Sequence, residues 1–143
     1  MRILDQEGLP YAIIGALALN EYGHRCVTID VDLVMRDGDL QTFKARWLGR
    51  GYAERAVGTG RLVDVETGVH IDVLSTGRFP GDDKPKPIAF PDPAVSAIRG
   101  PPFAMLPLRM WVELKRDTTR SRSRNVWMKA SRHCSDARSF GAK

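Results

Sequence analysis

Two aspartates inside one apolar segment constrain this chain more than any other feature of its sequence. Asp30 and Asp32 lie in residues 29–35, where the other five positions are Ile, Val, Leu, Val and Met. Such a segment is typical of a strand that is paired and mostly buried. Side chains two positions apart on a strand share a face, so the two carboxylates project together. Because like charges held this close repel, one carboxylate should take up a proton unless a cation lies between them, and a bound metal ion is the simplest account of the pair.

A third acidic residue occurs in another apolar segment. Asp72 lies in residues 69–74, which read Val-His-Ile-Asp-Val-Leu and predict a second strand. His70 shares a face with Asp72 by the same alternation, and a structural hydrogen bond is the simpler interpretation of this histidine. Asp30, Asp32 and Asp72 are therefore the candidate acidic cluster.

The remaining segments alternate between strand-like and helix-like patterns. The expected strands cover residues 11–14, 29–35, 52–57, 61–66 and 69–74, and the expected helices cover residues 16–22, 40–48 and 108–115. Residues 75–102 are rich in Pro and Gly, with an expected edge strand at 88–90. This order predicts the α/β class, as a two-layer α+β domain with a mixed, mainly antiparallel sheet and helices packed mainly on one face.

Charge divides the chain into an expected domain over residues 1–115 and a basic, Ser/Arg-rich tail over residues 116–143. Residues 115–143 carry nine Lys and Arg against two Asp, whereas residues 1–114 carry thirteen Lys and Arg against fifteen Asp and Glu. A segment rich in Ser and Arg without apolar periodicity attracts polyanions but does not build a core. We expect weak, nonspecific nucleic-acid contact through this tail, with a solvated tail as the favoured alternative.

The distribution of apolar residues indicates no membrane-spanning segment. No apolar run approaches the ~20 residues that span a bilayer. The N-terminus also lacks the basic-then-apolar layout of a signal peptide. The sequence therefore predicts a cytoplasmic protein with no membrane partner.

An ordered set of motifs resembles a known family. The set comprises Tyr-Ala-Ile-Ile-Gly-Ala-Leu-Ala at 11–18, Tyr-Gly-His-Arg at 22–25, Thr-Ile-Asp-Val-Asp-Leu at 28–33 and His-Ile-Asp-Val-Leu at 70–74. It resembles the polymerase-beta-like nucleotidyltransferase superfamily over about residues 9–115. The most similar members are the minimal and AbiEii-type proteins, many of which belong to toxin–antitoxin pairs. The ordered set is much more specific than the Asp-x-Asp motif alone.

The resemblance implies an activity and a cofactor. It implies transfer of a nucleoside monophosphate from a nucleoside triphosphate to a hydroxyl of a protein, an RNA or a small molecule that the sequence does not identify. Such transfer uses two Mg²⁺ ions, or Mn²⁺ in their place, which absorb charge on the pyrophosphate leaving group. By this resemblance Asp30, Asp32 and Asp72 are catalytic and ligate the metals, and Asp72 also helps to deprotonate the attacking hydroxyl.

The resemblance also implies contacts to the nucleotide. The turn at Gly15 and Ala16 would let the triphosphate approach backbone N–H groups at the start of a helix. Arg25, Thr28 and Lys115 complete the implied nucleotide-binding set. For Arg25 and Lys115, a surface ion pair is an alternative of equal weight.

Two departures from the family pattern leave a second class of function open. The turn reads Gly15-Ala16 where the family usually has Gly-Ser or Gly-Gly, and the Ser/Arg tail stands where further apolar helices are expected. A homodimer contact or a toxin or antitoxin partner would then cover the sheet. The alternative to an enzyme is a catalytically inactive module of the same fold, which acts as an antitoxin-like or regulatory partner.

Overall fold

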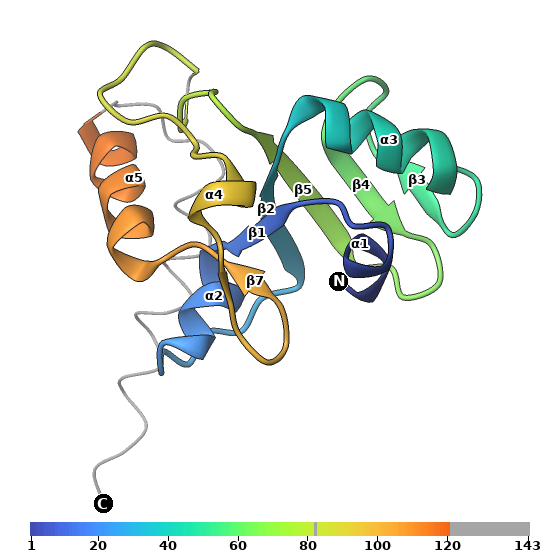
Figure 1. Cartoon of the computed structure of the whole chain (residues 1–143), viewed down its shortest axis with the longest axis horizontal. Helices are drawn as coiled ribbons and strands as arrows, with labels where there is room; N and C mark the ends of the chain where they lie inside the picture. Colours follow the sequence, from blue (N-terminus) through green and yellow to red (C-terminus); the bar gives the residue numbers. More distant parts are fainter. Residues whose placement is uncertain (82, 121–143) are drawn as a thin grey trace, which may run out of the picture.

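A seven-stranded mixed sheet organises the computed structural model, which describes residues 1–81 and 83–120 (Figure 1). Across the sheet the strands run β3 (Tyr52–Glu54), β4 (Arg61–Asp64), β5 (His70–Ser75), β2 (Asp30–Met35), β1 (Tyr11–Ile14), β7 (Ala104–Met105) and β6 (Ile98–Arg99). The β2–β5 and β1–β7 pairs are parallel and the other pairs are antiparallel. The predicted α+β class with a mixed, mainly antiparallel sheet is therefore confirmed.

Within the described residues, five helices accompany the sheet. They are α1 (Arg2–Gln6), α2 (Gly15–Glu21), α3 (Asp37–Trp47), α4 (Pro93–Ser96) and α5 (Leu108–Arg120). In α3, Asp37 and Asp39 occupy the first turn while Lys44 and Arg46 occupy the last. This distribution complements the helix dipole and favours a helix between the two aspartates and the two basic residues.

Strand β2 lies at the centre of the sheet, between β1 and β5. All six of its residues pair with β5, and four of them also pair with β1. Leu33, Val34 and Met35 are at most 2% exposed. The prediction that this segment is paired is confirmed, and the predicted burial is complete in its second half.

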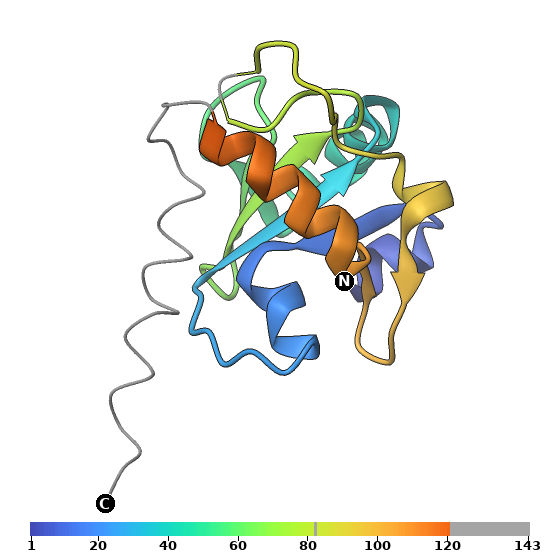
Figure 2. The ribbon, with the colours of Figure 1, turned by 90° about the vertical axis from the view of Figure 1, so that its left-hand side faces the viewer.

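Alternation along β2 divides its side chains between two hydrophobic clusters. Leu33 and Met35 pack in a cluster that includes residues of α1 and α3. Val34 packs in the other cluster, with Leu114 of α5. Figures 1 and 2 show α5 on the opposite side of β2 and β5 from α3. Asp30 and Asp32 share the face of Val34 and therefore lie on the side of the sheet that α5 crosses.

The structure differs from the sequence prediction in the connection to α5. Residues 88–90 form no strand; the backbone of Phe90 instead pairs with Gly77 and Arg78 through two hydrogen bonds of 2.8 Å. The short strands β6 and β7 were not predicted. Helix α5 continues to Arg120, past the expected boundary at residue 115, and residues 121–143 of the expected tail lie outside the described residues.

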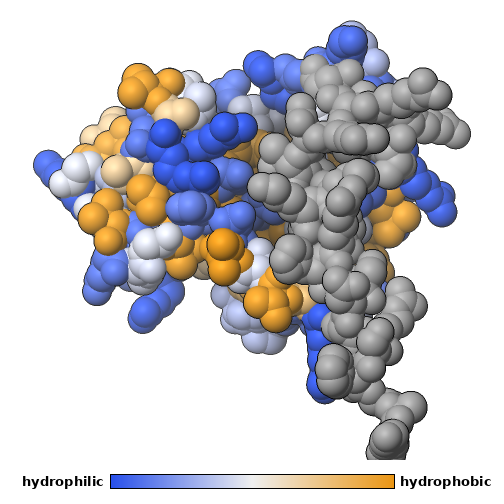
Figure 3. Space-filling model, turned by 180° about the vertical axis from the view of Figure 1, so that it is seen from behind, coloured by the Kyte–Doolittle hydropathy of each residue, from blue (hydrophilic) through white to orange (hydrophobic). Residues whose placement is uncertain are grey.

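The described surface carries exposed apolar side chains at separate places. The large ones are Val27, Ile29, Val57, Val65, Val95 and Ile98. Figure 3 shows hydrophobic residues scattered among hydrophilic ones over the part of that view that is not grey. None of the helices described for this chain has the length and apolar character needed to cross a membrane.

Replacing Ile13 by Ala tests the packing of β1. Ile13 is 0% exposed, and truncating a buried isoleucine typically costs about 2–5 kcal/mol because transfer free energy is lost and a cavity remains. Ile29→Ala is the matched control, since Ile29 is 78% exposed and its loss should change stability by no more than about 0.5 kcal/mol. Urea unfolding followed by circular dichroism measures both variants. Equal free energies of unfolding would contradict this account of the core.

Candidate functional site

Parallel pairing of β2 with β5 brings the three predicted carboxylates together. In this register Asp32 is the partner of Asp72, and Asp30 is the partner of His70. Register partners on neighbouring strands share a face of the sheet, with Cβ atoms about 5 Å apart. Asp30, Asp32 and Asp72 therefore form one cluster on the face that α5 crosses.

Asp32 is the most strongly perturbed of the three carboxylates. Its pKa is raised from an ordinary value of 3.8 to about 6. Burial is the largest cause, followed by repulsion from Asp72 and then from Asp30, while Lys115 opposes these effects. The like-charge repulsion expected from the sequence is therefore present, and Lys115 compensates only part of it.

Lys115 of α5 lies close enough to Asp32 to act on its charge. Burial lowers the pKa of Lys115, and the nearby Asp32 carboxylate raises it again in part. Its Nζ atom is 4.5 Å from the centre of the Trp111 ring, a cation–π arrangement that helps to hold the ammonium in place. The structure thus brings this sequence-predicted residue to the cluster.

The other two carboxylates have basic neighbours. Asp72 Oδ1 is 3.4 Å from Arg55 Nη1, and Asp30 Oδ1 is 3.3 Å from His70 Nδ1. The His70 contact does not have hydrogen-bond geometry, so Asp30 Oδ1 is a buried carboxylate oxygen with no hydrogen-bond partner among the described residues. A buried oxygen in this condition is costly unless a donor or a cation reaches it.

The carboxylates do not meet at one point. Within residues 1–81 and 83–120, no three Asp, Glu, His or Cys side chains are grouped closely enough to hold a metal ion. The contacts of Asp30 with His70 and of Asp72 with Arg55 draw these two carboxylates toward other partners. The donor set nonetheless fits Mg²⁺, because it offers hard carboxylate oxygens, one of which is buried without a hydrogen bond.

The Gly15 turn forms one wall of the cluster. Gly15 has φ +73°, a left-handed conformation that glycine adopts without strain, and it begins α2 directly after β1. A Cβ atom at Gly15 would lie 2.6 Å from Asp32 Oδ2. The Asp32 carboxylate therefore packs directly on the turn. Ala16 is 4% exposed, so its methyl group is packed inside the protein rather than offered to a ligand.

Thr28 and Arg25 have different places relative to the carboxylates. Thr28 Oγ1 bonds to both the carbonyl and the N–H of Asp30, at 3.0 and 3.3 Å, and so supports the start of β2. Arg25 is exposed in the loop between α2 and β2 and forms no ion pair with any described residue. The structure therefore gives Thr28 a supporting position and does not bring Arg25 to the carboxylates.

Two arginines near Asp72 were not singled out from the sequence. Arg55 contacts Asp72 directly, and Arg61 of β4 is its register partner. Neither belongs to an apolar motif, so composition gave no signal. Arg55 lies inside the expected 52–57 strand and Arg61 begins the expected 61–66 strand, and these positions became informative only once β4 was paired with β5.

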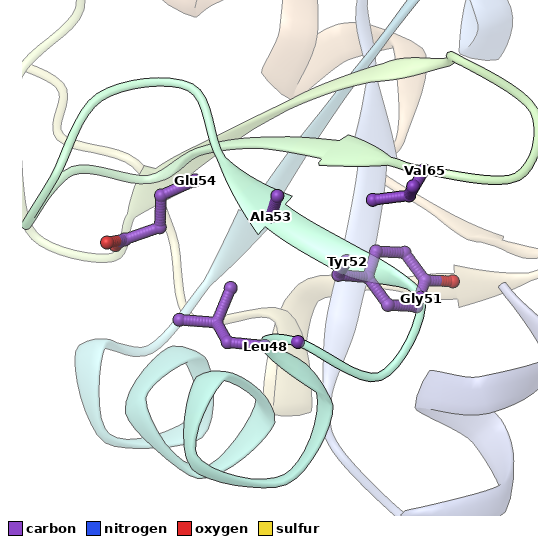
Figure 4. Close-up of a pocket in the computed structure, with 7 residues that line it drawn as sticks. Leu48, Gly51, Tyr52, Ala53, Glu54 and Val65 are labelled. Atoms are coloured by element: carbon purple, nitrogen blue, oxygen red, sulfur yellow. The ribbon is translucent and has the colours of Figure 1, made fainter.

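A shallow cavity of about 350 Å³ lies away from the carboxylates, between the end of α3 and the β3–β4 hairpin (Figure 4). Its lining residues are Leu48, Gly49, Gly51, Tyr52, Ala53, Glu54 and Val65. Glu54 is its only charged lining residue, and that carboxylate pairs with Lys44 at 2.6 Å. The cavity therefore offers little chemistry, and the candidate site is the carboxylate cluster.

Comparison with known proteins identifies no relative. No family model, curated protein or solved structure matches this chain. The resemblance to polymerase-beta-like nucleotidyltransferases therefore stays a prediction carried by the motif residues. The arrangement of those residues in the fold is the evidence from which a function can be proposed.

Replacing Gly15 by Ala tests the contact between the turn and Asp32. Gly8→Ala is the matched control, because Gly8 also has a positive φ (+66°) but no atom within 4 Å of an added Cβ. Both substitutions should lower the free energy of unfolding by about 1–2 kcal/mol, because alanine is strained in the left-handed conformation. Gly15→Ala should lower it further, because its methyl group displaces the Asp32 carboxylate. Thermal and urea unfolding measure the difference. Equal losses would show that Asp32 does not pack on the turn.

Replacing Asp32 by Asn tests whether the pKa of the Asp32 carboxyl is raised in the folded protein. Below pH 3.8 the carboxyl is protonated in both folded and unfolded chains; between pH 3.8 and about 6 only the folded chain keeps the proton. Wild-type stability relative to Asp32→Asn should therefore fall as pH rises through this window, by at most about 2–3 kcal/mol, and stay level above it. Urea unfolding of both proteins from pH 3.5 to 8 measures this difference. A difference that does not change with pH would contradict the electrostatic account.

Proposed function

We propose that this chain is a metal-dependent nucleotidyltransferase of the polymerase-beta-like type, which moves a nucleoside monophosphate from a nucleoside triphosphate to a hydroxyl acceptor. One observation carries the proposal: the parallel register that sets Asp32 beside Asp72, with Asp30 on the same face. Three carboxylates on neighbouring strands are unfavourable for stability alone, as the raised pKa of Asp32 indicates. The presence of three carboxylates in one cluster is understandable if they bind a cation for catalysis.

The three carboxylates fit divalent metal ions by their chemistry. Asp30, Asp32 and Asp72 would be the ligands, and the buried Asp30 Oδ1 without a hydrogen bond is an oxygen for which a cation would be the natural partner. Bound Mg²⁺ or Mn²⁺ would supply Lewis-acid stabilisation of charge on the phosphate oxygens. For the carboxylates to converge, Asp30 and Asp72 would have to turn from His70 and Arg55.

The remaining residues of the cluster support the donor side of the reaction. Lys115 is partly buried and lies near Asp32, so it can offer positive charge to a triphosphate without a large loss of solvation on binding. Gly15 allows a ligand to approach the backbone closely at the start of α2, since it has no Cβ atom. Asp72 is the residue we assign to accept the proton of the attacking hydroxyl.

A second candidate function follows from the spread of the carboxylates. As placed, no three acidic, His or Cys side chains among the described residues enclose an ion. A non-catalytic module of the same fold, with a regulatory or antitoxin-like role, would need no such convergence. Its binding to a partner would not depend on Asp32 or on a divalent metal.

Calorimetric titration of MgATP, MgGTP, MgCTP and MgUTP into the full-length protein tests the proposal. At least one triphosphate should bind with Mg²⁺ present, and Asp32→Asn should weaken that binding at least ten-fold because a metal ligand is lost. Glu66→Gln is the control, since Glu66 is an exposed carboxylate in the β4–β5 turn and its loss should leave binding unchanged.

Two results would contradict the proposed nucleotidyltransferase function. Absence of metal-dependent triphosphate binding to the wild-type protein would favour the non-catalytic module. Equal binding by wild type and Asp32→Asn would show that nucleotide is held elsewhere.

A further inference from the structure

One hydroxyl group joins two helices that are far apart in the sequence. Tyr22, the residue that follows α2, donates from its hydroxyl to the Leu106 carbonyl at 3.2 Å and accepts from the Leu108 N–H at 3.1 Å. Leu108 is the first residue of α5. The hydroxyl therefore bridges both sides of Pro107, at the point where the chain leaves the sheet. Figures 1 and 2 show the start of α5 beside α2.

Both bonds of the Tyr22 hydroxyl involve groups that need a partner. The first N–H groups of an α-helix have no acceptor inside the helix, so the Leu108 N–H depends on an acceptor from elsewhere. Leu106 is 1% exposed, and a buried carbonyl is costly without a donor. A hydroxyl donates and accepts at the same time, so one atom of Tyr22 serves both groups. Movement of α5 on α2 would break both bonds together.

The junction is also fixed to the sheet. Leu106 donates its N–H to the Ile13 carbonyl at 3.1 Å, and Ile13 lies in β1, two residues before Gly15. Helix α2 begins at Gly15 and is followed by Tyr22. The start of α5 is therefore held by β1 and by the end of α2, the two elements that meet at the Gly15 turn.

Lys115 lies two turns along α5 from this junction. Seven residues separate it from Leu108, so the two side chains share one side of the helix, ~10.5 Å apart along its axis. A tilt of about 10° at the start of α5 would displace Lys115 by ~2 Å. Between them, Trp111 packs against the core, and the centre of its ring lies 4.5 Å from Lys115 Nζ. The position of the ammonium thus depends on how the start of α5 is held.

This dependence bears on the carboxylate cluster, because interactions between charges weaken with distance. The Lys115 ammonium acts on the Asp32 carboxylate, which packs on the Gly15 turn. The turn and the ammonium are the two groups assigned to the triphosphate. One belongs to α2 and the other to α5, the two helices that Tyr22 joins.

We propose that Tyr22 is a positioning residue, whose hydroxyl holds α5 on α2 so that Lys115 stands beside Asp32 and the Gly15 turn. This inference rests on the proposed nucleotidyltransferase function and adds a residue to its donor side. Tyr22 acts through Lys115 and not by contact with the nucleotide. Loss of the hydroxyl lets α5 move, and fewer molecules then have Lys115 in place for a triphosphate.

A double-mutant cycle tests whether Tyr22 acts through Lys115. Tyr22→Phe removes the hydroxyl and keeps the ring, and Lys115→Met removes the ammonium and keeps an unbranched side chain. In calorimetric titrations with the magnesium triphosphate that the wild type binds, Tyr22→Phe should weaken binding about three- to ten-fold, but less than about two-fold in the Lys115→Met protein. Equal weakening in both backgrounds would overturn the inference, because Tyr22 would then have a merely structural role. Unchanged binding by Tyr22→Phe would overturn it as well.

Tyr11→Phe is the matched control for the loss of a tyrosine hydroxyl. Tyr11 is 2% exposed, and its hydroxyl donates to Asp5 Oδ2 at 3.2 Å, which joins β1 to α1 rather than to α5. Triphosphate binding by this variant should equal that of the wild type, with circular dichroism confirming that all variants are folded. Binding weakened as much as by Tyr22→Phe would overturn the inference, because a general loss of stability would then be the cause.

Backbone amide exchange gives a readout that needs no nucleotide. In Tyr22→Phe, exchange of the α5 amides from Leu108 to Lys115 should be at least about three-fold faster than in the wild type, whereas Tyr11→Phe should leave it unchanged. Unchanged α5 exchange in Tyr22→Phe would overturn the inference whatever the triphosphate result. A wild-type protein that binds no triphosphate, together with faster α5 exchange in Tyr22→Phe, would instead refute the proposed function and the role of Lys115 in it, while the hold of Tyr22 on α5 would stand.

Discussion

The parallel pairing of β2 with β5 is the constraint on which the rest of the structure depends. It is the longest ladder in the sheet, with six register pairs from Asp30 and His70 to Met35 and Ser75. A slip of one residue would set Asp32 beside Ile71 or Val73 and turn one strand's apolar side chains toward the wrong face. The apolar cores on both faces therefore oppose such a slip, and the packing that stabilises the domain also holds two carboxylates side by side.

Much of this arrangement could be predicted from the sequence, because strand alternation has a fixed period of two. The segments at 29–35 and 69–74 therefore indicated both the strands and the faces on which their aspartates lie. Alternation cannot state which strands are neighbours, so the closeness of Asp32 and Asp72 was a hypothesis that the register of β2 and β5 confirms. Strands β6 and β7 have two residues each, too few for a pattern; they join the sheet through the pairing of β7 with β1 and of β6 with β7.

The site was predicted where its residues belong to apolar motifs and missed where they do not. The aspartates stand out against their hydrophobic neighbours, whereas Arg55 and Arg61 are ordinary charges at strand ends. Their relation to Asp72 exists only through the antiparallel pairing of β4 with β5, a long-range contact that local composition does not encode. Arg25, which the motif suggested, lies instead in an exposed loop.

If the proposed metal binds, the affinity of the cluster for it depends on the difference in free energy between two arrangements of the carboxylates. In one, His70 and Arg55 neighbour the outer carboxylates while Lys115 compensates part of the charge at Asp32. In the other, the carboxylates turn inward and relieve their repulsion by sharing a divalent ion. The basic neighbours that stabilise the first arrangement would oppose the second and so would weaken the proposed metal binding. An anionic substrate that engaged Arg55 would release Asp72 from its partner and thereby favour convergence on the proposed metal ion. Under the proposed function, substrate and metal binding would then be coupled, and each would strengthen the other.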